Sequence, residues 1–436
     1  MKLRATILQT PTPHRLEALV DQVVTVDSQG SIVAVEPAQG IDVDLDLGDA
    51  AVLVPGMIDT HVHAPQWPQL YAGLDLPLEQ WLMEYTFPLE ARCADLDYAR
   101  EVWGEMVPAL LGQGTTTAVY YASIHEPATA ALAETCVRYG QRAFVGRVAM
   151  DHLTGTPEWY RDAGASEAVE ASHRSIQAIS AIAGADGLVQ PIITPRFIPA
   201  CTDALLTGLG ELADSTGVRI QTHCSESDWE HAYVLDRHGM TDTAALARFG
   251  LVRDHTVLAH GVHLTDSDCS TLIAAGAGIA HCPLSNAYFA NAVFPLRRHL
   301  DAGVRIGLGT DIAGGPEPSM FRQCAHAVAA SRMLEDGTEV GRAASDRGVP
   351  ASRVDLLTAF WTATVGGAEL LGIPAGVLAP GKVFDAVALR LHGAAAQADA
   401  ADGNWERVFE RVVAGASPRT IDSVWVAGRE VHRSQR

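Results

Sequence analysis

The stretch MIDTHVH, residues 57–63, joins a β-rich apolar run to two histidines at its carboxyl end. Successive side chains of a strand point to opposite faces, so His61 and His63 share one face. Seven further β-rich runs follow, at 115–122, 143–150, 188–197, 219–226, 256–263, 278–286 and 305–311. Most of the eight are continuously apolar, which is typical of parallel strands buried on both faces.

The segments between these runs have helical character. In residues 97–114, Val102, Met106 and Leu110 recur at four-residue spacing, and Gly112 and Gly114 close the pattern. Eight alternations of strand and helix predict an α/β protein with a (β/α)₈ TIM barrel. The alternative is an open, doubly wound sheet, but no G-x-G-x-x-G motif opens the first unit.

Both ends of the chain carry hairpin patterns outside this alternation. Residues 20–35 hold two short β-rich runs around a turn at 27–30, and residues 423–433 form a second such pair. We expect the termini to build one small β-sandwich domain from residues 1–54 and 373–436. The metal-dependent barrel then occupies residues 55–372.

Composition narrows the range of partners. The chain has 436 residues, 48% of them hydrophobic, and a formal net charge of -21. Such a charge argues against binding to nucleic acid or to an anionic membrane. The sequence shows neither a secretory signal nor an apolar run long enough to span a bilayer. Seven scattered cysteines without a C-x-x-C pair favour reduced thiols in a cytoplasmic enzyme.

Polar residues cluster where the predicted strands end, which is where barrel enzymes build their active sites. His61 and His63 end the first run, His223 lies in the fifth, and Asp311 ends the eighth. Three imidazoles and one carboxylate, with water as a further ligand, fit a catalytic zinc site. Nitrogen and oxygen ligands also suit iron, so the sequence leaves that ion possible.

The lysine content bears on the number of metal ions. Lys2 and Lys382 are the only lysines of the chain, and both lie outside the predicted barrel strands. A carboxylated lysine that bridges two metals, as some barrels have, is therefore not available. We expect one metal ion per chain.

Several motifs resemble the amidohydrolase superfamily. They are PGMIDTHVH at 55–63, HCSE at 223–226, AHG at 259–261 and GTD at 309–311. PGKVFDAV at 380–387 is similar to the run that leads such chains back into their small β-domain. The resemblance covers nearly the whole chain and implies metal-dependent hydrolysis.

Within that superfamily, three segments resemble the guanine deaminase family: the long loop 63–92, TPRF at 194–197 and HCP at 281–283. The resemblance implies hydrolysis of guanine to xanthine and ammonia, and a homodimer. Zinc deaminases of the other fold carry H-x-E with P-C-x-x-C, and neither element is present here.

The resemblance also implies roles for three groups. Asp311 would accept a proton from the attacking water. His260 would orient that water, or serve as an additional metal ligand. Glu226, three residues after His223, would protonate a ring nitrogen and later the leaving ammonia.

The same resemblance implies substrate contacts. Arg196 can donate to the ring carbonyl that guanine has and adenine lacks, although a structural ion pair is the commoner role of an arginine. Gln66 can donate to and accept from a purine edge, and Phe197 could stack on the ring or lie in the core. Asp59 shares the inward face with both histidines and would orient them. We interpret Trp81, Cys224 and Cys282 as packing residues.

Two alternatives remain open from the sequence. A related deaminase acting on a pterin, 8-oxoguanine or a triazine would share all of the metal chemistry. A non-catalytic scaffold of the same family would have lost its metal ligands, whereas every ligand position is filled here.

Overall fold

The computed structural model describes residues 1–182 and 187–434, and each of the eight predicted runs contains a strand. The strands are β6 (Met57–His63), β7 (Thr115–Tyr121), β8 (Arg142–Gly146) with β9 (Val148–Ala149), β10 (Val189–Pro191) with β11 (Thr194–Pro195), β12 (Gln221–Cys224), β13 (Val257–His260), β14 (Gly278–His281) and β15 (Arg305–Leu308). The third and fourth runs are each interrupted. In the fourth, Pro191 and Pro195 lack the N–H that a continuous ladder needs.

These strands form two four-stranded parallel sheets, ordered β10-β8-β7-β6 and β12-β13-β14-β15, with β11 paired to β9. A parallel bridge between Ile193 and Ile220 links the two halves. On the other side, the Asp311 N–H donates to the His61 carbonyl at 2.9 Å. The His63 N–H likewise donates to the Ile312 carbonyl at 3.0 Å. The predicted α/β architecture of parallel strands is thus confirmed.

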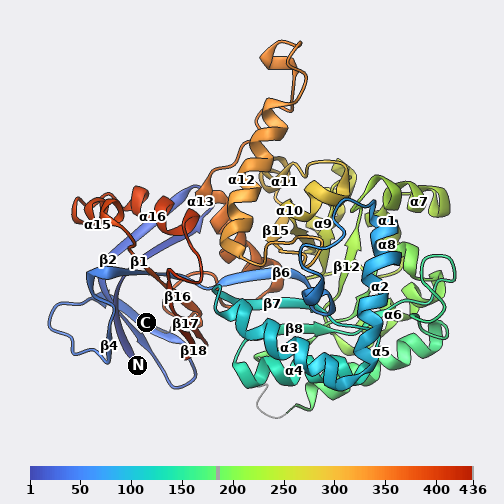
Figure 1. The fold of residues 1–436 in the computed structure, drawn as a ribbon, viewed down its shortest axis with the longest axis horizontal. Coiled ribbons are helices and arrows are strands. Elements are labelled where there is room, and N and C mark those ends of the chain that lie inside the picture. Colours follow the sequence, from blue (N-terminus) through green and yellow to red (C-terminus); the bar gives the residue numbers. More distant parts are fainter. Residues whose placement is uncertain (183–186, 435–436) are drawn as a thin grey trace.

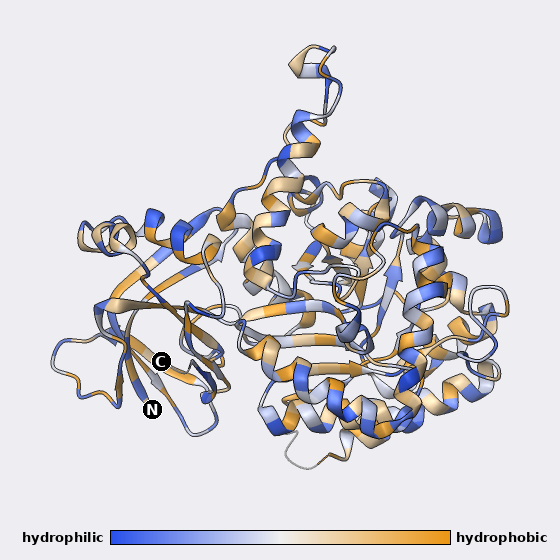
Figure 2. Ribbon diagram, in the orientation of Figure 1, coloured by the Kyte–Doolittle hydropathy of each residue, from blue (hydrophilic) through white to orange (hydrophobic). Residues whose placement is uncertain are grey.

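Helices cover the outer faces of these sheets (Figure 1). The helix predicted over 97–114 is α3 (Leu96–Leu111), and its buried residues include Val102, Met106 and Leu110. The other α-helices of this part are α1 (Leu78–Trp81), α2 (Phe87–Ala91), α4 (Glu126–Tyr139), α5 (Ala165–Ser180), α6 (Asp203–Thr216), α7 (Asp228–His238), α8 (Asp242–Arg248), α9 (Asp266–Ala275), α10 (Pro283–Ser285), α11 (Leu296–Asp301), α12 (Met320–Asp336), α13 (Leu356–Trp361) and α14 (Gly367–Leu371). Figure 2 shows apolar residues concentrated in the strands and polar residues on the outer helices. No helix of the described ranges has the length and apolar character that crossing a bilayer requires.

The two ends of the chain meet in one mixed sheet ordered β18-β17-β16-β5-β1-β2-β3, with β4 paired to β1. Its strands are β1 (Lys2–Thr12), β2 (Arg15–Val26), β3 (Ile32–Pro37), β4 (Leu45–Asp46), β5 (Ala51–Pro55), β16 (Ala386–Arg390), β17 (Ile421–Val426) and β18 (Arg429–Arg433). Both predicted hairpins form, as β2–β3 and β17–β18. The strands make a single hydrogen-bonded path where we predicted a sandwich, and the helices α15 (Ala394–Ala401) and α16 (Trp405–Ala414) were not predicted. The domain boundaries at 54/55 and 372/373 stay a prediction.

A buried ion pair joins the terminal sheet to the parallel sheets. Asp385, just before β16, accepts hydrogen bonds from Arg142 at 3.1 and 3.3 Å, and their side chains are 2% and 10% exposed. The same carboxylate accepts from the Ala427 N–H at 2.7 Å. Asp385 lies in the 380–387 motif, so this pairing gives the motif a structural reason.

Asp385→Ala should therefore lower stability strongly, because it leaves the Arg142 charge buried without its partner. Breaking a buried pair costs ~3–5 kcal/mol, whereas an exposed pair contributes ~0–1 kcal/mol. Urea denaturation should show the loss for Asp385→Ala and little change for Glu430→Ala, which breaks the exposed pair with Arg433. Similar denaturation midpoints for the two variants would contradict this role.

Candidate active site

The predicted site residues gather at the carboxyl ends of the parallel strands. His61 and His63 end β6, His260 ends β13, and His223 lies one residue before the end of β12. Asp311 follows β15 by three residues and has a φ of 52°. His260 also has a left-handed φ, of 73°. Left-handed backbone is unfavourable for a side-chain-bearing residue, and such strain collects at functional sites.

The side chains from these four strand ends converge on one point. The His61 and His63 Nε2 atoms lie 3.1 and 3.4 Å from the Asp311 Oδ1. The Nε2 atoms of His63 and His223 are 3.0 Å apart. Ligand atoms of His61, His223, His260 and Asp311 all lie within 4.8 Å of one another. The structure therefore brings together all four predicted ligands, and His260 with them.

The hydrogen bonds around this cluster set the imidazole tautomers. The His223 Nδ1 faces the Arg196 carbonyl at 2.5 Å, so this nitrogen carries the proton and the Nε2 has a free lone pair. The His260 Nδ1 lies 2.9 Å from the Asn286 Oδ1, which gives the same assignment. Burial lowers the pKa of His61, His63 and His223 well below the ordinary histidine value. Neutral imidazoles with converging lone pairs form a donor set that fits a metal cation.

Unpaired nitrogens support this fit. The buried Nδ1 and Nε2 atoms of His61, the Nδ1 of His63 and the Nε2 of His260 have no hydrogen-bond partner among the described residues. Buried polar atoms are normally hydrogen-bonded, so several unpaired nitrogens in one place indicate a ligand site.

Asp59 acts differently from our expectation. It is fully buried, and its carboxylate accepts hydrogen bonds from the N–H and Oγ1 of Thr310, at 2.9 and 2.6 Å, and from the backbone N–H of His61. It therefore fixes the backbone next to Asp311 and does not hydrogen-bond the imidazole rings. Burial raises its pKa to about 7.

Glu226 lies beside the cluster, on the turn after β12. Its Oε1 is 3.7 Å from the His260 Nε2. Its backbone N–H donates to the Glu230 carboxylate at 2.7 Å, and the preceding N–H, of Ser225, donates to Asp242 at 3.1 Å. Burial, and then the charge of Asp311, raises the pKa of Glu226 well above its ordinary value. A carboxyl in this environment can hold a proton near neutral pH and donate it.

A small cavity opens directly onto this cluster. Its lining includes the three predicted substrate contacts, Gln66, Arg196 and Phe197, together with Glu226. The remaining lining residues are His63, Leu78, Trp81, Leu82, His223, Phe289, Asp311 and Gly314. Trp81 packs on Phe289, with ring centroids 4.9 Å apart, as we interpreted it, but it also forms part of the cavity wall. The loop after β6 supplies that side of the wall through Gln66, α1 (Leu78–Trp81) and Leu82. The helix α2 (Phe87–Ala91) follows in the same loop and has no residue in the cavity lining.

Arg196 forms the ion pair that we weighed as its alternative role. Its Nη1 and Nη2 donate to the Glu90 carboxylate at 2.6 and 3.0 Å, and both side chains are buried. Burial acts to lower the pKa of Arg196, but the charge and hydrogen bonds of Glu90 leave it raised. Sequence reasoning missed Glu90. Its place inside the 63–92 loop, three residues after Phe87, was the only indication available.

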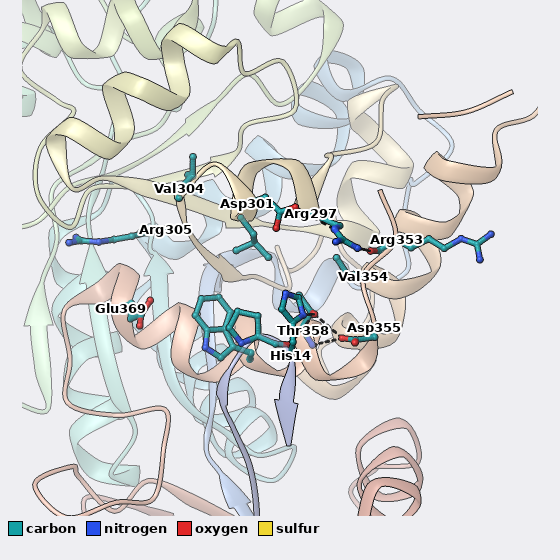
Figure 3. A pocket seen from close by; sticks show the side chains of 14 residues that line it. His14, Arg297, Asp301, Val304, Arg305, Arg353, Val354, Asp355, Thr358 and Glu369 are labelled. Atoms are coloured by element: carbon teal, nitrogen blue, oxygen red, sulfur yellow. Dashed lines mark hydrogen bonds and ion pairs between the residues drawn. The ribbon is translucent and has the colours of Figure 1, made fainter. Parts of the chain in front are cut away.

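A wider hollow lies at the opposite, amino-terminal end of β15 (Figure 3). Its arginines already have acidic partners: Arg297 pairs with Asp301, Arg305 with Asp254, and Arg353 with Glu335 and Asp336. Catalytic groups of barrel enzymes lie at the carboxyl ends of the strands, so the smaller cavity is the candidate active site.

Comparison with known proteins agrees with this geometry. Residues 52–431 match the model of the amidohydrolase family, and the chain belongs to that family. A probable guanine deaminase of Schizosaccharomyces pombe is 39% identical over 389 residues, which cover 87% of this chain and 71% of that protein. A guanine deaminase structure from C. acetobutylicum, with guanine bound in the active site, aligns with a TM-score of 0.89, 28% identity and 99% coverage of both chains. A zinc-bound adenosine deaminase from Xanthomonas campestris aligns with a TM-score of 0.83 and 25% identity, over 98% of this chain and 92% of that chain.

Metal removal should destabilise the protein, because the converging lone pairs bind a cation only in the folded state. A ligand at 100 times its dissociation constant adds ~2.7 kcal/mol to the stability. Adding zinc to chelator-treated protein should raise the unfolding temperature. His223→Ala should abolish the rise, and His281→Gln, at the end of β14, should keep it. A rise of equal size in His223→Ala would place the metal elsewhere.

Proposed function

We propose that this protein is a guanine deaminase, which hydrolyses guanine to xanthine and ammonia. The observation that carries the proposal is the convergence of four imidazoles and Asp311 beside Glu226, in a cavity that Arg196 and Gln66 also line. The similarity to guanine deaminases over most of the chain supports the choice of substrate.

The proposed cofactor is one zinc ion per chain, held by His61, His63, His223 and Asp311, with His260 beside the water. Nitrogen and oxygen donors suit zinc and iron alike, and the zinc-bound family neighbour favours zinc. Both lysines of the chain lie outside the parallel strands, which supports a single ion. When bound, zinc lowers the pKa of water so that a nucleophile is available near neutral pH.

The acid and base groups divide the proton transfers. Asp311 takes a proton from the attacking water, and the His260 Nε2, 3.9 Å from the Asp311 Oδ2, orients that water. Glu226 enters the reaction protonated, in line with its raised pKa, and gives its proton to the ring nitrogen next to the reacting carbon. A C–O bond forms, and the new hydroxyl and Asp311 then release two protons as the hydroxyl becomes a carbonyl. One proton passes through Glu226 to the amino group, the C–N bond breaks and ammonia leaves, and the other proton returns Glu226 to its protonated form.

The substrate contacts follow from the cavity wall. Arg196 would donate to the ring carbonyl, and Gln66 would donate to a neighbouring acceptor on the purine edge. Phe197, whose ring centroid lies 6.1 Å from that of His223, would pack on the purine ring.

The fold supports three further proposals. The two parallel sheets would be halves of one closed (β/α)₈ barrel, because hydrogen bonds or a bridge link them on both sides. The protein would be cytoplasmic, because all seven of its cysteines are free and buried. It would also form a homodimer, as family resemblance implies.

Glu226→Gln should collapse turnover while the metal content stays unchanged. The amide keeps the size of the side chain but cannot shuttle protons, and groups of this kind contribute ~10²–10⁴-fold to rate. Steady-state ammonia release would measure the loss, with Glu211→Gln on the exposed face of α6 as the control. If Glu226→Gln keeps its turnover, another group moves the protons.

Substrate choice should follow the donors of the cavity. Ammonia release from guanine, 8-oxoguanine, isoxanthopterin, adenine and cytosine should give the highest kcat/KM with guanine. The amino group of adenine would leave the Arg196 donors unpaired, which costs ~1–3 kcal/mol or ~10–100-fold. Arg196→Ala should narrow the ratio of guanine to adenine activity by a similar factor. A higher kcat/KM with adenine or a pterin would show that the proposed substrate is wrong. It would not contradict the proposed hydrolytic chemistry of the site.

A further inference from the structure

The buried carboxylate of Glu90 connects two of the polar side chains that line the cavity, Gln66 and Arg196. Its Oε1 accepts from the Gln66 Nε2 at 2.9 Å and from the Arg196 Nη2 at 3.0 Å. Its Oε2 accepts from the Arg196 Nη1 at 2.6 Å and from the Tyr160 hydroxyl at 3.0 Å. Glu90 is 0% exposed and is not a lining residue itself. It therefore acts through the side chains that it holds.

Glu90 fixes the direction of the Gln66 amide. The Gln66 Oε1 accepts from the Ala313 N–H at 3.0 Å, and a backbone N–H can only donate. The Nε2 faces a carboxylate, which can only accept. Both ends of the amide are thus assigned, and one N–H of Gln66 remains for a ligand.

The same short helix immobilises Arg196. Glu90 and Phe87 both belong to α2, and the Phe87 ring centroid lies 4.8 Å from the Arg196 Cζ. Two N–H groups of the guanidinium bind the carboxylate in the bidentate geometry that holds it in one plane. The three N–H groups left over then have fixed directions.

Glu90 also decides the charge of this wall. Its negative charge cancels the positive charge of Arg196, which is the only arginine or lysine among the described residues that line the cavity. The wall therefore offers hydrogen-bond donors without a net positive charge. Such a surface suits a neutral ring with a carbonyl acceptor and disfavours an anion.

We propose that Glu90 is the specificity-positioning residue of the site. It orders the donors of Arg196 and Gln66 and makes them selective for neutral purines over purine anions. This inference rests on the proposed function for the identity of the ligand. It adds the residue that sets the charge and the orientation of the binding wall.

The test measures equilibrium binding of two ligands that cannot lose an amino group. Hypoxanthine is a neutral purine with a ring carbonyl, and urate is a purine anion at neutral pH. Glu90→Gln removes the charge and places an amide N–H₂ among donors. It should weaken hypoxanthine binding by ~10-fold or more and strengthen urate binding, because Arg196 then lacks its counter-charge. Glu84→Gln, on the exposed part of the same loop, should change neither the dissociation constant of hypoxanthine nor that of urate.

Tyr160→Phe covers the possibility that Glu90→Gln does not fold. It removes one of the four hydrogen bonds to Glu90 but keeps the Glu90 charge, so it should weaken hypoxanthine binding by a smaller factor and should not strengthen urate binding. Unchanged hypoxanthine binding in intact Tyr160→Phe would overturn the positioning role. Unfolding temperature and zinc content show whether each variant is intact. Unchanged binding in intact Glu90→Gln, or equal weakening of both ligands, would overturn the proposal. So would a wild-type protein that does not bind hypoxanthine. If the wild type binds hypoxanthine but releases no ammonia from guanine, the proposed function fails and the role of Glu90 stands.

Discussion

The hydrogen bonds that hold the end of β15 against the end of β6 are the constraint on which the site depends. The Asp311 N–H donates to the His61 carbonyl, and the His63 N–H donates to the Ile312 carbonyl. These bonds join residues about 250 positions apart in the sequence, and they place an acidic side chain beside two imidazoles. The remaining histidines arrive from β12 and β13, which lie in the same parallel sheet as β15. This strand contact therefore brings the predicted ligand atoms of two separate sheets to one place.

Sequence reasoning found the strands and the polar residues that end them, because both depend on local patterns. Alternation in residues 57–63 placed His61 and His63 on one face, and the structure brings them together with His223 and Asp311. Sequence reasoning failed where the hydrogen-bond partner of a residue comes from a distant segment of the chain. Asp59 was expected to hold the histidine rings and instead holds Thr310, which no spacing rule links to it. The helices α15 and α16 were missed because only the hairpin patterns near them were considered.

The cavity wall around Arg196 shows the same limit of sequence reasoning, because the partner of this arginine lies in a distant segment. Arg196 was weighed as either a substrate contact or a structural ion pair, and the structure shows the ion pair in a side chain that also lines the cavity. A guanidinium has five N–H groups, so two can bind Glu90 while others remain for a ligand. Which carboxylate pairs with it depends on how the loop after β6 folds back over the sheet. The sequence of this loop has no periodic pattern from which that folding could be predicted.

The left-handed backbone at the strand ends has a consequence for attempts to make the enzyme more heat-resistant. Ser225, His260 and Asp311 all have positive φ values, of 52°, 73° and 52°. A non-glycine residue there costs roughly 1–2 kcal/mol. Glycine would relieve that cost, yet at His260 and Asp311 it would delete the groups proposed to do the chemistry. Of these three residues only Ser225 has no proposed chemical role, so Ser225→Gly is the change that can raise folding stability without removing such a group. At His260 and Asp311, a change that would raise thermal stability would therefore also remove catalytic turnover.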